Sequence, residues 1–254
     1  MKAFWVASAS ANIMYHDVPG MGSPLIFIHG LGCASSCDYP RVILDAALRG
    51  RRAILVDLLG SGFSERPFRF GYSIDDHAHS IAELVRNACE EPVSIFGHSM
   101  GGAVAITLAT LLGPKADKIV LTEPNLEPGG GIFSTKIAEM SEEDYIARGH
   151  ATTIEDARAA GNTIWAASLA ISAPHAVHRG AASLVAGSEP TWLAMLHALP
   201  MPKTVIFGEH SLPSADFARL QRDGCNVDTV PNAGHSMASD NPSGLAEAIC
   251  KAVR

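Results

Sequence analysis

Short runs of apolar and β-branched residues alternate along the chain with segments of helical periodicity. This alternation is typical of a mostly parallel sheet with helices on both faces, because parallel strands need a crossover connection between them. The nearly continuous apolar character of the runs indicates strands buried on both faces. The expected strands are a leading hairpin, Phe4–Ser8 and Asn12–His16, and six core strands, Leu25–Ile28, Ala53–Val56, Val93–Phe96, Lys118–Thr122, Lys203–Phe207 and Asn226–Val230. The pattern predicts an α/β fold around an eight-stranded sheet.

Two segments carry clear helical signals. Apolar residues recur at spacings of three and four from Ile74 to Ala88, which forms one stripe for burial. Ser73 precedes this stripe and two aspartates follow in the first turn, a pattern that caps a helix and matches its dipole. The segment Met100–Leu112 is apolar on all sides and stops at a Gly-Pro pair, so it is expected to be a buried helix.

The interval 125–188 breaks the alternation of strands and helices. It opens with a Pro-Gly-rich stretch and continues as alanine-rich segments of helical character. We interpret it as a helical cap inserted into the core. The expected division is therefore a core made of residues 1–124 and 189–254, with residues 125–188 as the cap.

The composition limits what the protein can bind. The net charge is −7, and the 19 Lys and Arg residues form no basic run, so a nucleic-acid or anionic-membrane partner is not expected. No apolar stretch reaches the roughly 20 residues that span a bilayer, and the N-terminal apolar run is short for a secretory signal. The five cysteines show no paired spacing, which indicates free thiols in a reducing compartment. We expect a cytoplasmic protein.

The motif with the strongest chemical meaning is Gly97-His98-Ser99-Met100-Gly101, which matches the G-x-S-x-G pattern of a nucleophile elbow. A buried strand enters this motif and an apolar helix leaves it, which is the context that the elbow requires. So tight a turn strains the serine, and the flanking glycines let neighbouring backbone pass without a Cβ clash. The helix also points its N-terminal amides at the serine, where they stabilise a developing negative charge. Ser99 is the predicted nucleophile.

Several motifs together resemble the alpha/beta-hydrolase superfamily over most of the chain. His29-Gly30-Leu31-Gly32 is similar to the family's oxyanion loop, and Asp57–Ser64 is similar to a turn that has a structural role. The resemblance implies that the backbone amides of Leu31 and Met100 bind the oxyanion. Gly234-His235 resembles the loop of the catalytic histidine, so His235 is expected to be the base that accepts the serine proton.

The acid of the predicted triad departs from the commonest pattern of the family. Most relatives have an aspartate just after the strand that here ends at Phe207, but the turn reads Gly208-Glu209-His210-Ser211, with serine at that position. A second location known in the superfamily, as in some haloalkane dehalogenases, follows the preceding strand, where Glu123 stands. The strand end and the chain order Ser99, Glu123, His235 favour Glu123. Glu209 and Asp216 remain alternatives.

Other conspicuous residues have plain structural interpretations. His98 is expected to pack under the sheet edge, as residues in such elbows do. Cys33 and Cys37 flank the oxyanion loop without companion ligands, so a metal site is not expected. Trp165 is interpreted as part of an apolar pocket or core.

The predicted chemistry is acyl transfer to water through an acyl-serine, without a cofactor, on a small carboxylic ester that binds between cap and sheet. Relatives with the same elbow also cleave carbon–carbon bonds of vinylogous diketones, so a ketone substrate is the alternative. A receptor that binds a ligand without turnover is a third hypothesis, since fold alone does not decide function. Dehalogenation is not expected, because it uses a carboxylate nucleophile. The protein is expected to be a monomer or homodimer.

Overall fold

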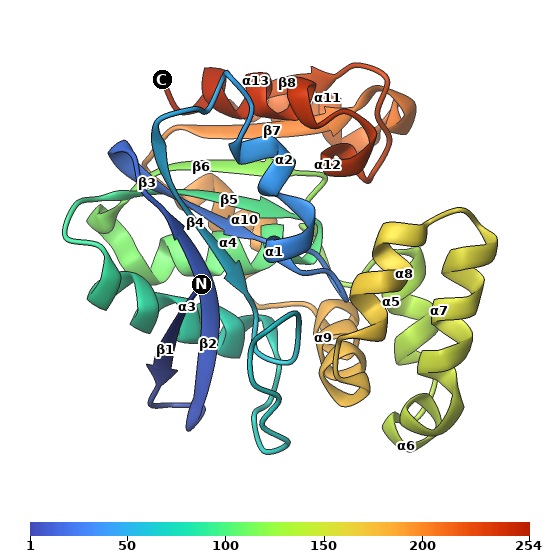
Figure 1. Cartoon of the computed structure of the whole chain (residues 1–254). Helices are drawn as coiled ribbons and strands as arrows, with labels where there is room; N and C mark the ends of the chain where they lie inside the picture. The colour runs from blue at the N-terminus through green and yellow to red at the C-terminus, as the bar shows by residue number, and fades with distance from the viewer.

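In the computed structural model, which describes all 254 residues, eight strands form a single sheet in the order β1-β2-β4-β3-β5-β6-β7-β8 (Figure 1). Strands β3 to β8 are mutually parallel, whereas β1 and β2 form an antiparallel hairpin at one edge. The strands are β1 Lys2–Val6, β2 Ala11–Val18, β3 Met21–Ile28, β4 Arg51–Asp57, β5 Val93–His98, β6 Ala116–Thr122, β7 Lys203–Gly208 and β8 Asn226–Val230. The predicted α/β class with an eight-stranded sheet is confirmed.

Thirteen α-helices connect the strands. They are α1 Ser35–Asp38, α2 Pro40–Ile43, α3 Ile74–Ala88, α4 Met100–Leu112, α5 Ile132–Ala138, α6 Glu142–Asp144, α7 His150–Ala159, α8 Thr163–Ala170, α9 Pro174–Ala186, α10 Trp192–Ala198, α11 Ala215–Arg222, α12 Met237–Asp240 and α13 Pro242–Ala252. Helices α3 and α4 have the limits that the sequence predicts. Ser73 caps α3 by accepting a hydrogen bond from the backbone of Asp76, whose side chain reciprocates. None of the helices combines the length and apolar content needed to cross a lipid bilayer.

The sheet separates two hydrophobic cores because successive side chains of a strand point to opposite faces. In β3, Ile26 and Ile28 belong to the larger core, which α3, α4 and α10 cover. Leu25 and Phe27 belong to the smaller core, which contains residues of α2, α12 and α13. Burial on both faces explains why the sequence of each central strand is almost uniformly apolar.

The carboxyl ends of the parallel strands lie at one edge of the sheet, and the loops that follow them carry the chemically interesting residues. The register shows this alignment directly, since Ile28 of β3 pairs with Gly97 of β5, and His98 of β5 pairs with Thr122 of β6. The residues that follow β3, β5 and β6 are therefore neighbours in space although they are far apart in the chain.

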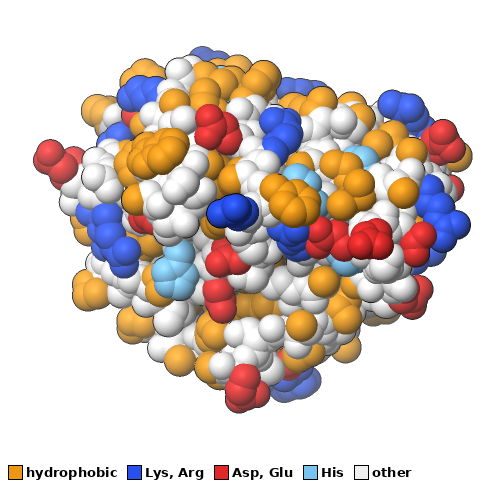
Figure 2. Space-filling model, turned by 90° about the horizontal axis from the view of Figure 1, so that it is seen from below, with side chains coloured by type: hydrophobic (Ala, Val, Ile, Leu, Met, Phe, Trp, Pro, Cys, Tyr) orange, Lys and Arg blue, Asp and Glu red, His pale blue; other side chains and the backbone are white.

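Helices α5 to α9 stand beyond this edge of the sheet and form a separate group of helices (Figure 1). The side chain of Arg179 in α9 fixes this group to the core by donating hydrogen bonds to the backbone carbonyls of Phe68 and Phe70. The same guanidinium forms an ion pair with Glu142 at 2.6 Å. On the face seen in Figure 2, basic and acidic residues are interspersed without a continuous basic patch.

Candidate active site

Ser99 occupies the sharp turn between β5 and α4. Its backbone has φ 53° and ψ −117°, a conformation that residues with a side chain rarely adopt. Its amide donates a hydrogen bond to the carbonyl of Thr122 at 2.9 Å, which ties the turn to β6. This hydrogen bond to the sheet thus stabilises the strained backbone of Ser99.

The glycines of the motif are explained by close backbone approaches. A Cβ at Gly97 would lie 2.2 Å from the carbonyl oxygen of Gly101, and one at Gly101 would lie 2.5 Å from the carbonyl oxygen of His29. Both distances are too short for any side chain. The spacing G-x-S-x-G is therefore a steric requirement of this turn.

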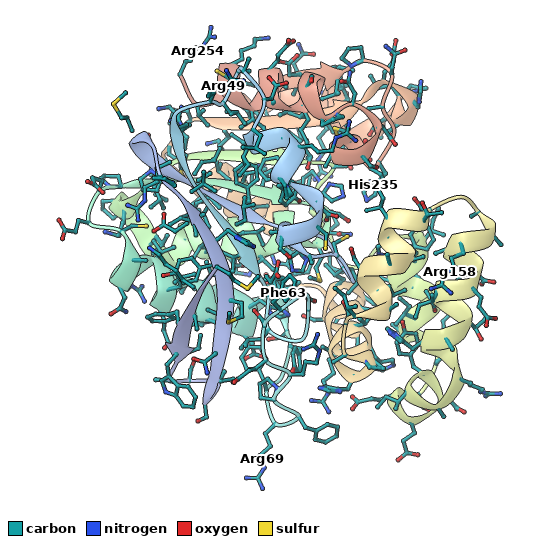
Figure 3. The ribbon with its side chains drawn as sticks, viewed as in Figure 1. Arg49, Phe63, Arg69, Arg158, His235 and Arg254 are labelled. Carbon is teal, nitrogen blue, oxygen red and sulfur yellow. The ribbon has the colours of Figure 1, made fainter.

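His235 and Glu123 form the central charged contact of the site. Nδ1 of His235 lies 2.6 Å from Oε2 of Glu123, and the other carboxylate oxygen accepts a hydrogen bond from the Gly208 amide at 3.0 Å. Glu123 immediately follows β6 with φ 40°, so a strained backbone presents its side chain to the histidine. The side chain of Glu123 is 12% exposed and that of His235 is 50% exposed. Figure 3 shows His235 on the side of the core that faces the group of helices α5 to α9.

The carboxylate of Glu123 remains ionised near neutral pH. Burial pushes the pKa of Glu123 upward, but hydrogen bonds from His235, the Gly208 amide and Ser211 outweigh it and lower this pKa to about 2. The pair therefore orients the imidazole with Nδ1–H toward the acid and leaves Nε2 free to accept a proton. This is the tautomer that a general base needs.

The two alternative acids form no hydrogen bond or ion pair with His235. Glu209 accepts a hydrogen bond from the backbone amide of Asn232 at 2.7 Å and so stabilises a loop. Asp216 lines the same cavity as His235, at the first turn of α11. Ser211, which occupies the position of the commonest acid, lies near Glu123, and its hydroxyl helps to lower the pKa of that carboxyl. The serine is thus a partner of the relocated carboxylate.

The two amides assigned to the oxyanion site are free of partners. The amides of Leu31 and Met100 donate no hydrogen bond to any protein acceptor, and Met100 is the first residue of α4, where the helix dipole favours negative charge. Trp165 of α8 donates a hydrogen bond from Nε1 to the carbonyl of Leu31 at 2.8 Å. A side chain of α8 therefore contacts the backbone of the loop that follows β3.

Ser99, His235 and Glu123 line one cavity of about 550 Å³, a size suited to a small molecule. Apolar side chains of α5 and α8, including Phe133, Ile164 and Trp165, form part of its wall. The rings of Phe133 and Trp165 pack with centroids 4.6 Å apart. No hydrogen bond joins the hydroxyl of Ser99 to His235 in this structure, although both residues line the cavity.

His98 has a closer relation to the site than the sequence indicated. Its ring packs against that of His235 with centroids 4.7 Å apart, and its Nδ1 lies 3.0 Å from the hydroxyl of Thr122. Burial, with a smaller contribution from His235, lowers the pKa of His98 to about 3, so the ring is neutral. The expectation that His98 packs under the sheet edge is incomplete, because the residue also lines the cavity.

The remaining motif residues have structural partners. The carboxylate of Asp57 accepts hydrogen bonds from the amides of Ser36 and Phe63 and from the Ser36 hydroxyl. A Cβ at Gly62 would lie 2.2 Å from this carboxylate, which explains the glycine in the turn. No three His, Cys, Asp or Glu side chains form a group that could hold a metal ion.

Sequence comparison finds relatives for part of the chain. It is 36% identical over 116 residues to haloalkane dehalogenase 2 of Mycobacterium tuberculosis, a match that covers 45% of this chain and 38% of that protein. It is 32% identical over 120 residues to 2-hydroxymuconate semialdehyde hydrolase of a Pseudomonas species, which covers 46% and 41%. The matched region thus spans less than half the length of these curated relatives.

The fold and a family profile extend the likeness to nearly the whole chain. An esterase from Thermogutta terrifontis superimposes with a TM-score of 0.84 over 100% of this chain and 98% of that one, at 18% identity, which is a likeness of fold. Residues 25–248 match the profile of the alpha/beta hydrolase family. The chain therefore belongs to the alpha/beta hydrolase family.

Proposed function

We propose that the protein is a serine hydrolase that cleaves small carboxylic esters. The proposal rests on one observation, that the strained Ser99, the free amides of Leu31 and Met100, and the ion pair of His235 with Glu123 share one cavity. A serine hydroxyl attacks a carbonyl only when a neighbouring base removes its proton, and His235 has Nε2 available for this step.

The proposed reaction proceeds in two acyl transfers. Oγ of Ser99 bonds to the carbonyl carbon while its proton passes to Nε2 of His235, and the oxyanion accepts hydrogen bonds from the Leu31 and Met100 amides. His235 then protonates the departing alcohol, which leaves an acyl-serine. Water attacks this ester with His235 again as base, and the carboxylic acid is released. Glu123 stabilises the imidazolium in both steps without accepting its proton.

We further propose that residues 125–188 are a cap that covers the cavity, with residues 1–124 and 189–254 as the catalytic core. Helices α5 and α8 supply part of the apolar wall of the cavity, so the cap residues are expected to contact the apolar part of the ester.

Turnover of p-nitrophenyl esters of increasing acyl length tests this proposal. We expect the highest kcat/KM on short chains, and we expect Ser99→Ala to be inactive. A fluorophosphonate probe should label Ser99 in the natural protein and in Ser236→Ala, which removes another cavity serine, but not in Ser99→Ala. Absence of labelling, together with thermal stabilisation by a bound ligand, would favour the receptor hypothesis instead.

Carbon–carbon bond hydrolysis is the second candidate because two curated relatives, similar over less than half their length, are named 2-hydroxymuconate semialdehyde hydrolase and 2-hydroxy-6-oxo-2,4-heptadienoate hydrolase. The same serine, base and oxyanion amides suit a ketone carbonyl as well as an ester. Loss of the visible absorbance of a vinylogous diketone, measured beside ester hydrolysis, separates the two. A diketone turned over with much higher kcat/KM than every ester would replace the ester assignment.

A further inference from the structure

The wall of the cavity includes a polar region that the proposed reaction does not use. Asp38, the last residue of α1, and Tyr39 line the same cavity as Ser99 and His235, together with Cys33 of the oxyanion loop. Asp38 is neither fully buried nor fully exposed, as expected for a side chain that faces an enclosed space. These residues belong to the segment that follows β3, far in the sequence from helices α5 to α9.

The carboxyl of Asp38 has no basic partner. It takes part in none of the ion pairs of the protein and makes no side-chain hydrogen bond; the only group that lowers its pKa is the nearby thiol of Cys33. Arg41 also lines the cavity but forms no ion pair with Asp38. A carboxyl in an enclosed site without a cation is costly to ionise.

Titratable neighbours make ionisation of Asp38 still less favourable. Burial raises the pKa of Asp38 to about 7, the nearby Cys33 thiol opposes this shift, and the Asp57 carboxylate adds to it. The thiols of Cys33 and Cys37 have pKa values raised by burial, so both stay neutral. Below neutral pH, Asp38 is therefore a carboxylic acid with an O–H to donate.

Tyr39 contributes a second buried donor. The residue is 1% exposed, and its hydroxyl has no hydrogen-bond partner in the protein. Burial raises the pKa of Tyr39 well above its usual value, with Asp38 and Cys33 adding to the effect, so the phenol stays protonated. Its ring is held by Phe27 and Phe96 at centroid distances of 5.1 and 5.3 Å. An unpaired buried hydroxyl carries a free-energy cost that a bound acceptor would remove.

The backbone that carries these donors is firmly anchored. The hydroxyl of Ser35 donates to the carbonyl of Phe27, and the amide and hydroxyl of Ser36 both donate to Asp57. The subsite is therefore set by β3 and β4 at a fixed position relative to the strand end that carries Ser99, and such pre-organisation favours discrimination between ligands.

We propose that Asp38 and Tyr39 form a hydrogen-bonding subsite that selects substrates carrying a carbonyl or hydroxyl oxygen away from the bond that is cleaved. This inference rests on the proposed function in that it treats the bound molecule as a substrate. The binding preference itself can be measured without turnover. The subsite adds hydrogen-bonding groups from α1 to a cavity whose wall includes apolar side chains of α5 and α8.

Binding to the Ser99→Ala protein tests the subsite separately from catalysis. The matched probes are ethyl 4-oxopentanoate and ethyl pentanoate, which differ by one ketone oxygen, and Kd is measured by NMR titration at pH 6. We expect about tenfold tighter binding of the oxo ester, the value of one buried hydrogen bond. Adding Asp38→Ala should bring the two Kd values within about twofold, whereas the control Asp75→Ala, on the exposed surface of α3, should keep the full preference.

A conservative variant separates the hydrogen bond from mere packing. Asp38→Asn keeps the shape and an N–H donor, so we expect it to retain most of the preference for the oxo ester. In the parent the preference should fall above about pH 7, when the acid loses its O–H, whereas in Asp38→Asn it should not change with pH. Tyr39→Phe should weaken the preference at every pH.

Two results would overturn the subsite. One is equal Kd values for both probes in the Ser99→Ala parent at pH 6. The other is a preference that persists unchanged in both Asp38→Ala and Tyr39→Phe. If the natural protein hydrolyses simple esters but shows either result, the ester-hydrolase proposal stands and the subsite fails. If the subsite binds as expected but no ester is cleaved, the reverse holds.

Discussion

Replacing Glu123 with glutamine tests the triad most sharply, because the structure predicts how the amide will orient. Oε1 of Glu123 accepts a hydrogen bond from the Gly208 amide at 3.0 Å, while Oε2 lies 2.6 Å from Nδ1 of His235. In Glu123→Gln, the Gly208 amide keeps the carbonyl oxygen on its own side. The NH2 group must then face His235 and donate to Nδ1.

This contact forces the histidine into the wrong tautomer. When Nδ1 accepts, the ring proton resides on Nε2, so Nε2 can no longer remove the proton of Ser99. The lost negative charge also no longer offsets the imidazolium. Together we expect kcat to fall by a factor on the order of 10⁴, which corresponds to about 5 kcal/mol of transition-state stabilisation.

The measurement is kcat and KM for a short-chain p-nitrophenyl ester, with thermal melting as a check on folding. Glu209→Gln is the matched control, because this neighbouring carboxylate contacts the Asn232 amide and not the histidine. It should keep kcat within a few-fold. Wild-type turnover in Glu123→Gln, or an equal loss in Glu209→Gln, would refute the argument.

Three further outcomes follow from the geometry. Gly97→Ala should lower the free energy of unfolding, measured by urea denaturation, by about 3 kcal/mol, because its Cβ would lie 2.2 Å from the Gly101 carbonyl oxygen. Gly234→Ala, where the nearest contact of the Cβ is 3.8 Å, should change this free energy little. Trp165→Phe removes the donor to the Leu31 carbonyl, so kcat should fall several-fold with little change in melting temperature. Replacement of the exposed Trp5 by phenylalanine serves as the control. Equal kinetics in the two variants would contradict the role of Trp165. Asp38→Asn should raise the melting temperature at pH 8 but not at pH 4. The folded-state pKa of Asp38 is about 7, above the ordinary value of an aspartate, so ionisation destabilises the fold as the pH rises between the two values, and asparagine cannot ionise. An equal effect at both pH values would show that Asp38 is not the titrating group.

The fold was accessible from the sequence because its signals are local. A strand buried on both faces must be largely apolar, and β3 to β7 each contain such an apolar run, whereas β8 is of mixed composition and only partly buried. The observed strands extend beyond these runs, since hydrogen-bond ladders continue into polar residues at the strand ends. The elbow was equally readable, because the steric contacts of Gly97 and Gly101 permit no other residue.

Glu123 shows how far a local pattern reaches. Chain order and strand position favoured Glu123 over Glu209 and Asp216. Which carboxylate contacts the histidine, however, depends on its distance in space from a residue 112 positions away in the chain. The structure brings the two side chains together through the parallel register of β6 and β7 and the loop after β8. The effect of Ser211 on the pKa of Glu123 had no sequence signal, since a serine at that position looked only like a missing acid.

The sequence by itself determined the order of strands and helices, the strained serine and the set of residues able to act, because each depends on neighbours a few positions away. Only the tertiary structure decided that Asp38 and Tyr39 line the cavity of Ser99, that Trp165 donates a hydrogen bond to the Leu31 carbonyl, and that His98 packs against His235. These are contacts between segments that meet at one edge of the sheet. They depend on burial and on three-dimensional proximity, which no spacing along the chain records.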